Sequence, residues 1–160
     1  MNLLILTQKI DIDDDLLGFF HGWVAELAKY FEKITVIALG VGEYDLPNNV
    51  KVLSLGKEGM RTAEINANSA HANSYSRHWH NIRRLALYLL RFYQYIWQEH
   101  KNYDSVFVHM NQEYVILGGI FWRLLGKKVA LWRNHKTGGF RVRVAVFLSD
   151  IVFCTSQFAF

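Results

Sequence analysis

The chain has 160 residues, enough for one domain with its own hydrophobic core. Hydrophobic residues make up 51% of it and charged residues 20%, a balance that excludes intrinsic disorder. The net charge is +4, and the longest apolar stretch, Tyr114 to Trp122, is far below the roughly 20 residues of a membrane span. The single cysteine and the absence of a signal-peptide pattern in the start, MNLLILTQK, favour a cytoplasmic protein.

The first third of the chain predicts three strands and one helix. Apolar runs at residues 2–6, 34–39 and 50–55 are typical of buried strands. Residues 7–15 are polar and predict a loop after the first strand. A helix should follow this loop, because apolar side chains recur there at spacings of three and four: Leu16, Phe20, Trp23, Val24, Leu27 and Phe31.

The middle of the chain predicts a long loop and a long helix. Residues 57–76 have little apolar content or period and predict a mobile loop, with a functional flap as one reading. Residues 77–100 predict a helix with one apolar stripe, formed by Ile82, Leu85, Ala86, Leu89, Tyr93, Ile96 and Trp97.

The last third alternates strands and helices. Strands are predicted over residues 105–108, 129–132 and 151–155, and helices over residues 112–126 and 139–148. The strand, helix, strand order implies right-handed crossovers and parallel strands. The predicted fold class is therefore α/β: a Rossmann-like, doubly wound, mostly parallel six-stranded sheet.

Polar residues follow two of the predicted strands directly. His109 and Asn111 come after the fourth strand, and His135 and Lys136 after the fifth. In an open parallel sheet, ligands bind outside the carboxyl ends of the strands, so these residues are candidates for chemistry or recognition. The plain alternative is that both histidines are ordinary surface-loop residues.

The predicted first loop is acidic and contains no glycine. Asp11, Asp13, Asp14 and Asp15 would repel a pyrophosphate, which argues against a dinucleotide or P-loop site. Two readings remain open. Asp14 or Asp15 can cap the helix in a solvated loop, or the carboxylates can accept hydrogen bonds from sugar hydroxyls.

The region from 123 to 143 is basic and contains no acidic residue. It favours an anionic partner, whether as a solvated surface, a phosphate clamp or a membrane-surface patch. Arg141 and Arg143 beside Phe140 suit contact with anionic lipid, and no nucleic-acid recognition module is present. The basic residues are Arg123, Lys127, Lys128, Arg133, Lys136, Arg141 and Arg143.

No metal-ligand spacing is found in the sequence, and Cys154 is predicted to be inert within a buried strand.

Three segments together resemble a known family. They are VFVHMNQEYVILGGIFWRLLGKKVALWRNHKTG at residues 106–138, FCTSQFAF at 153–160 and DDDLLGFFHGWVAELAKYFEKITVIALG at 13–40. Their order and spacing resemble the amino-terminal domain of family 4 glycosyltransferases of the GT-B fold. The likeness is closest to compact bacterial members that act on cell-surface glycans.

The resemblance implies a hexosyltransferase-type enzyme. Such enzymes transfer a sugar with retention from a nucleotide-sugar to a glycan or lipid-linked acceptor, usually without a metal. Their amino-terminal domain holds the acceptor, and a carboxy-terminal domain holds the donor. We expect residues 1–160 to be the acceptor-binding domain, without its donor domain, inactive alone and able to work peripherally at the inner membrane face.

The resemblance also assigns residues to roles. His135 matches a catalytic position near the transferred sugar, and Thr155 and Ser156 match positions that line the cleft. The positions that match acceptor-binding residues are Asp14, Asp15, His21, His109, Asn111 and Lys136. The alternative function is a non-catalytic module that binds a glycan, a lipid phosphate or a partner subunit, because one fold hosts many functions.

Overall fold

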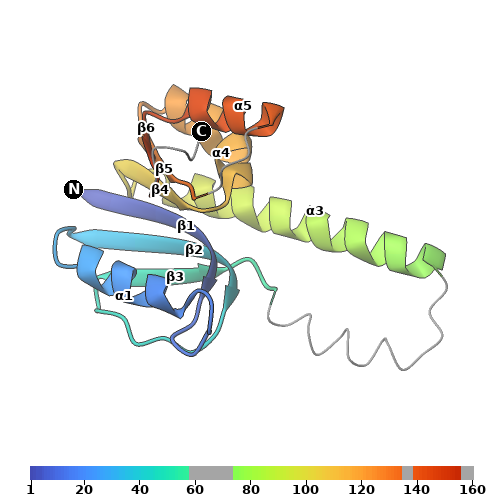
Figure 1. Ribbon diagram of the computed structural model, residues 1–160, viewed down its shortest axis with the longest axis horizontal. Coiled ribbons are helices and arrows are strands. Elements are labelled where there is room, and N and C mark those ends of the chain that lie inside the picture. Colours follow the sequence, from blue (N-terminus) through green and yellow to red (C-terminus); the bar gives the residue numbers. More distant parts are fainter. Residues whose placement is uncertain (58–73, 135–138, 156–160) are drawn as a thin grey trace.

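A parallel sheet of six strands forms the centre of the protein (Figure 1). The computed structural model describes residues 1–57, 74–134 and 139–155. The strand order is β3-β2-β1-β4-β5-β6, and each neighbouring pair is parallel, which confirms the α/β Rossmann-like prediction. The strands are β1 (Asn2–Ile10), β2 (Lys33–Val41), β3 (Val50–Ser54), β4 (Ser105–His109), β5 (Lys128–Trp132) and β6 (Ile151–Phe153).

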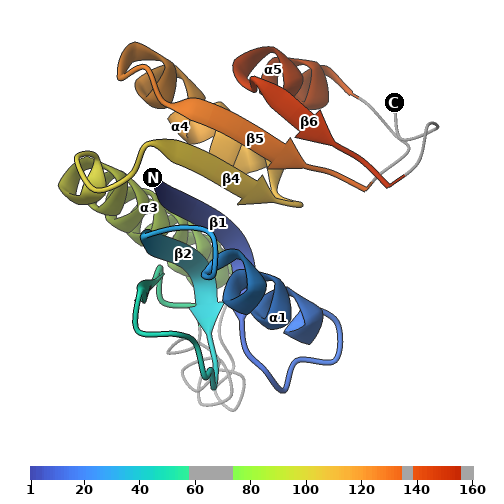
Figure 2. The same cartoon turned by 90° about the vertical axis from the view of Figure 1, so that its left-hand side faces the viewer.

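Helices cover both faces of the sheet (Figure 2). The helices are α1 (Gly18–Leu27), α3 (Ser74–Glu99), α4 (Gln112–Leu124) and α5 (Phe140–Leu148). Helix α1 packs on one face over β1 and β2, where Phe20 and Val24 join the strand residues of one buried cluster. On the other face, α3, α4 and α5 pack over a second cluster that holds Phe92, Trp122 and Leu148. Among the described residues, no helix is long and apolar enough to cross a membrane.

The centre of the sheet is a topological switch point. Strand β1 pairs with β2 on one side and with β4 on the other, so the chain leaves the two strands in opposite directions along the sheet. Loops and helices that follow β1 and β4 therefore diverge and leave a crevice at the carboxyl ends of these strands.

Strand β1 is longer than its sequence predicts. Residues 7–10 belong to β1 rather than to the predicted loop, and they continue the pairing with β2, with Lys9 opposite Gly40 and Ile10 opposite Val41. Thr7 and Ile10 are fully buried while the intervening residues are not. The polar sequence hid this part of the strand because the two side chains between Thr7 and Ile10 are not buried.

Three further sequence predictions are wrong in detail. Leu16 precedes α1 and is 82% exposed, so it does not belong to the buried stripe of that helix. Cys154 follows β6 and is exposed instead of lying in a buried strand. Asp14 does not cap α1 itself; its Oδ1 accepts the backbone N–H groups of Leu16 and Leu17 in the turn before the helix. Of the predicted loop over 57–76, residues 58–73 lie outside the described residues.

Candidate functional site

Two cavities lie side by side at the carboxyl edge of the sheet. The larger has a volume of about 870 Å³ and the smaller about 660 Å³. Gln8 of β1 and Met110, which follows β4, line both cavities. Met110 has a backbone φ of 59°, and its N–H donates to the carbonyl of Trp132. Positive φ is uncommon for a side chain of this size, and such strain concentrates at functional sites.

One wall of the larger cavity is aromatic. Phe19 and Trp23 of α1 and Trp132 at the end of β5 line it. The rings of Trp23 and Trp132 meet edge to face, with centroids 4.9 Å apart, and Phe19 meets Trp23 in the same way at 5.7 Å. These contacts hold the indoles in fixed orientations, and Phe19 remains 51% exposed. The wall is therefore a rigid apolar surface that is open to a ligand.

Another part of the lining of the larger cavity is charged and consists of Lys9, Asp11 and Asp14. Lys9 Nζ lies 2.6 Å from a carboxylate oxygen of both Asp11 and Asp14. The hydrogen bond from Lys9 lowers the pKa of Asp14 to about 2, helped by the N–H groups of Leu16 and Leu17. Lys9 lowers the pKa of Asp11 in the same way. Both carboxylates are therefore ionised acceptors at neutral pH.

Gly42 at the rim of this cavity leaves room for the acidic wall. A β-carbon at position 42 would lie 2.2 Å from Asp11 Oδ2, which is inside contact distance. The Gly42 N–H also donates to the carbonyl of Ile10 and ties β1 to β2 at this point. Any larger residue at position 42 would push Asp11 away from Lys9.

His109 lies beneath the aromatic wall and not in a surface loop, so the surface-loop reading of this histidine is wrong. Its side chain is 1% exposed, its ring stacks on Phe20 at a centroid distance of 3.8 Å, and Nδ1 lies 3.2 Å from Thr7 Oγ1. Burial lowers the pKa of His109 to about 4, so the ring is neutral at neutral pH. Within the described part of the chain, its buried Nε2 finds no hydrogen-bond partner.

The smaller cavity lies where α4 and α5 begin. Asn111 and the first residues of α4, Gly139 and the first residues of α5, and Arg133 line it. Two helix amino termini give this cavity a positive field, and Arg133, 3% exposed, adds a cation. Glu113 in the same lining adds an acidic group, so the cavity has charges of both signs.

The structure brings some of the predicted site residues together and not others. Asp14 and Thr155 line the larger cavity, and Asn111 lines the smaller one. Asp15 and His21 line neither; His21 is 7% exposed, and its Nε2 accepts the N–H of Asp45. The predicted residues that lie outside the described ranges are His135, Lys136 and Ser156.

Sequence reasoning missed the aromatic wall. The sequence pattern gives no site signal for Phe19 and places Trp23 in the apolar stripe of the helix. Trp132 was recognised only as the last apolar residue of its strand. Its position there is the one signal that could have found it, because the last residue of a parallel strand lies next to the binding crevice.

No metal site is found in residues 1–57, 74–134 and 139–155. No three histidine, cysteine or acidic side chains there are grouped so that they could hold an ion. Lys9 Nζ contacts both Asp11 and Asp14, so a protein cation already balances one of their two negative charges.

Comparisons with known proteins identify the fold. No protein-family model matches the chain, and no curated protein matches its sequence. Two similar solved structures are UDP-GlcNAc 2-epimerase from Methanocaldococcus jannaschii, with TM-score 0.50 and 13% identity, and MurG from Acinetobacter baumannii, with TM-score 0.56 and 11% identity.

Both similar structures are GT-B fold enzymes. Each likeness covers 99% of this chain, which spans only 40% of the epimerase and 42% of MurG. The chain therefore has the fold of one Rossmann-like half of a GT-B enzyme.

Proposed function

We propose that this chain is the acceptor-binding domain of a retaining glycosyltransferase that resembles family 4. In this proposal the enzyme transfers a sugar from a nucleotide-sugar to a glycan or lipid-linked acceptor during cell-surface polysaccharide synthesis. The observation that carries the proposal is the larger cavity, whose lining combines aromatic side chains with ionised carboxylates at the switch point of the sheet.

The two walls match the two kinds of surface on a sugar ring. The C–H face of a pyranose is apolar and packs on aromatic rings, as on Trp23 and Trp132. The hydroxyl groups at the ring edge donate hydrogen bonds, which Asp11 and Asp14 can accept because both are ionised. A cavity of about 870 Å³ accommodates more than one sugar unit.

The donor would come from a second domain. The two similar enzymes are more than twice as long as this chain, and the name of one of them includes the nucleotide-sugar UDP-GlcNAc. Transfer requires a donor in register with the acceptor, and one half of a cleft cannot supply this positioning. We therefore expect the isolated chain to bind acceptor without turning over donor.

Replacement of Trp132 with alanine should weaken acceptor binding by about tenfold, which corresponds to about 1.4 kcal/mol. The Trp132 ring forms part of the aromatic wall and holds Trp23 in place by an edge-to-face contact. The substitution therefore removes one stacking surface and loosens the other. Calorimetric titration of the variant with an oligosaccharide that binds the wild type would measure the change.

The matched control for this experiment is Tyr30→Ala. Tyr30 is an exposed aromatic residue that lines neither cavity, so this variant should bind like the wild type. Equal affinity of wild type and Trp132→Ala for every ligand would place the sugar elsewhere.

A second candidate function is a glycan-binding module without catalysis. It is favoured by the state of the titratable groups around the larger cavity. Lys9 holds Asp11 and Asp14 ionised, and burial keeps His109 neutral beneath the wall, so none of them titrates near neutral pH. A general acid or base works best with a pKa near the working pH. Sugar transfer with the donor domain present separates the two functions.

A further inference from the structure

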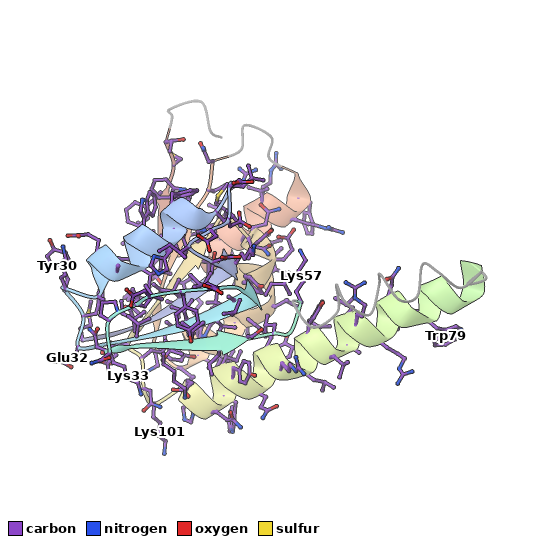
Figure 3. The ribbon with its side chains drawn as sticks, turned by 90° about the horizontal axis from the view of Figure 1, so that it is seen from below. Tyr30, Glu32, Lys33, Lys57, Trp79 and Lys101 are labelled. Carbon is purple, nitrogen blue, oxygen red and sulfur yellow. The ribbon has the colours of Figure 1, made fainter. Side chains whose placement is uncertain are left out.

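The two cavities at the carboxyl edge of the sheet are separated by two side chains only. The larger cavity is lined by α1, which covers one face of the sheet, and the smaller one by the first residues of α4 and α5, which cover the other face (Figure 2). Gln8 and Met110 line both cavities, and we call them the divide. In Figure 3, Lys57 of the larger cavity lies at the carboxyl ends of the strands, whereas Tyr30 and Lys33 lie at the opposite ends. A ligand that occupies both cavities would therefore cross the edge of the sheet over the divide.

A tight turn fixes the divide in place. The Asn111 N–H donates to the carbonyl of His109, two residues earlier, so Met110 is the centre of a γ-turn. The positive φ of Met110 belongs to the rare and strained form of this turn. The Met110 N–H donates to the carbonyl of Trp132, which links the turn to the aromatic wall of the larger cavity. Directly after the turn, Asn111 and Gln112 line the smaller cavity.

The lining of the smaller cavity is mostly polar. It includes the amide of Gln112, the guanidinium groups of Arg133 and Arg141, and the carboxylate of Glu113. An amide both donates and accepts hydrogen bonds, a guanidinium group donates them and a carboxylate accepts them. The hydroxyl groups of a sugar unit can use all three kinds of group. An acyl chain would instead displace water from Gln112 and Arg141 without replacing its hydrogen bonds. The cavity is therefore matched to a polar ligand unit, and its volume of about 660 Å³ lies in the range of small-molecule sites.

We propose that the smaller cavity binds the second sugar unit of the acceptor, so that the acceptor is an oligosaccharide of at least two units. The inference rests on the proposed function, in which the first unit stacks on the aromatic wall of the larger cavity. The second unit then lies beyond the divide and exchanges hydrogen bonds with Gln112 of α4 and Arg141 of α5. This assignment favours a glycan with two adjacent polar units over a single sugar joined directly to an acyl chain.

A titration with matched monosaccharides and disaccharides tests the second subsite. The probes are glucose with maltose, galactose with lactose, and N-acetylglucosamine with its β-1,4-linked dimer. The ¹⁵N-labelled indole of Trp132 in the whole chain reports binding at the larger cavity. The wild type should bind at least one disaccharide about tenfold more tightly than the matching monosaccharide, because the second unit adds hydrogen bonds of its own.

The double variant Gln112→Ala, Arg141→Ala removes the contacts assigned to the second unit. Gln112 is partly exposed and Arg141 is exposed, so the variant should fold, which circular dichroism checks. Its affinity for the disaccharide should fall about tenfold, while its affinity for the monosaccharide should stay the same. The matched control is Gln98→Ala, which changes an exposed glutamine of α3 that lines neither cavity and should bind both sugars as the wild type does.

The variant Gly139→Trp tests the same subsite by filling it. Gly139 lines the smaller cavity, and its backbone is extended, so any residue can adopt its conformation. Among the described residues, no atom lies within 4 Å of the position that a β-carbon would take there. An indole at this position should exclude the second unit and lower disaccharide affinity about tenfold, to the level of the monosaccharide.

The results that would overturn this inference differ from those that would overturn the proposed function. Equal affinity of the wild type for every disaccharide and its monosaccharide would exclude the second subsite and leave the larger cavity as an acceptor site. Full disaccharide affinity in both the double variant and Gly139→Trp would exclude it as well. If no probe shifted the Trp132 signal, the proposed function would fail together with the inference.

Discussion

Replacement of His135 with alanine should lower the turnover number of the proposed transferase by about 10²- to 10⁴-fold, the range of a lost general acid–base or transition-state contact. His135 lies outside the described residues, so its role rests on the resemblance alone. The two residues before it, Arg133 and Asn134, line the smaller and the larger cavity, respectively.

The assay for this prediction is sugar transfer by the chain together with its donor-binding domain. The matched control is His100→Ala at the end of α3, a histidine that lines neither cavity. We expect the control to keep full turnover and His135→Ala to keep acceptor affinity. If His135→Ala turned over like the wild type, the catalytic role of this residue would be wrong.

The second large effect concerns stability and pH. The pKa of His109 falls from an ordinary 6.5 to about 4 on folding, because the ring is buried. Between these two pKa values the unfolded chain binds a proton at His109 and the native state does not. The free energy of unfolding therefore falls as the pH falls from about 6.5 towards 4. Between pH 7 and pH 5 the loss should be about 2 kcal/mol in the free energy of unfolding.

Urea denaturation at the two pH values measures this loss. In His109→Phe the titrating group is gone, so most of the difference between pH 7 and pH 5 should disappear. This variant leaves the buried Thr7 hydroxyl without its hydrogen-bond partner, which should lower the free energy of unfolding by about 1–3 kcal/mol. The loss is the same at both pH values, so it cancels in the comparison. His100→Gln should keep the full pH difference, and an unchanged difference in His109→Phe would show that another group causes it.

The central strands were predictable because they are largely buried and their sequences are continuous apolar runs. Two strand ends were not predicted correctly. Strand β6 ends at Phe153, before the predicted Thr155, and β1 continues through Gln8 and Lys9, whose polar side chains line the cavities. Helix α1 began later than predicted because Asp14 organises a separate turn before it.

The candidate site was only partly predictable. Polar residues at strand ends pointed to the correct edge, and Asp14, Asn111 and Thr155 do line cavities there. The depth of a residue is set by tertiary packing, so no sequence pattern could show that His109 lies under Phe19 and Trp23. An aromatic residue in the apolar stripe of a helix is predicted to be a core residue, whether it lies in the interior or lines a cavity.

The indole N–H resonances of the five tryptophans give the most direct test of acceptor binding at the larger cavity. Protein labelled with ¹⁵N-tryptophan is titrated with a panel of hexose and N-acetylhexosamine oligosaccharides. A binding glycan should shift the signals of Trp23 and Trp132 and leave those of Trp79, Trp97 and Trp122 unchanged. Shifts by glycan only outside the cavity, or none with any oligosaccharide of the panel, would contradict the account.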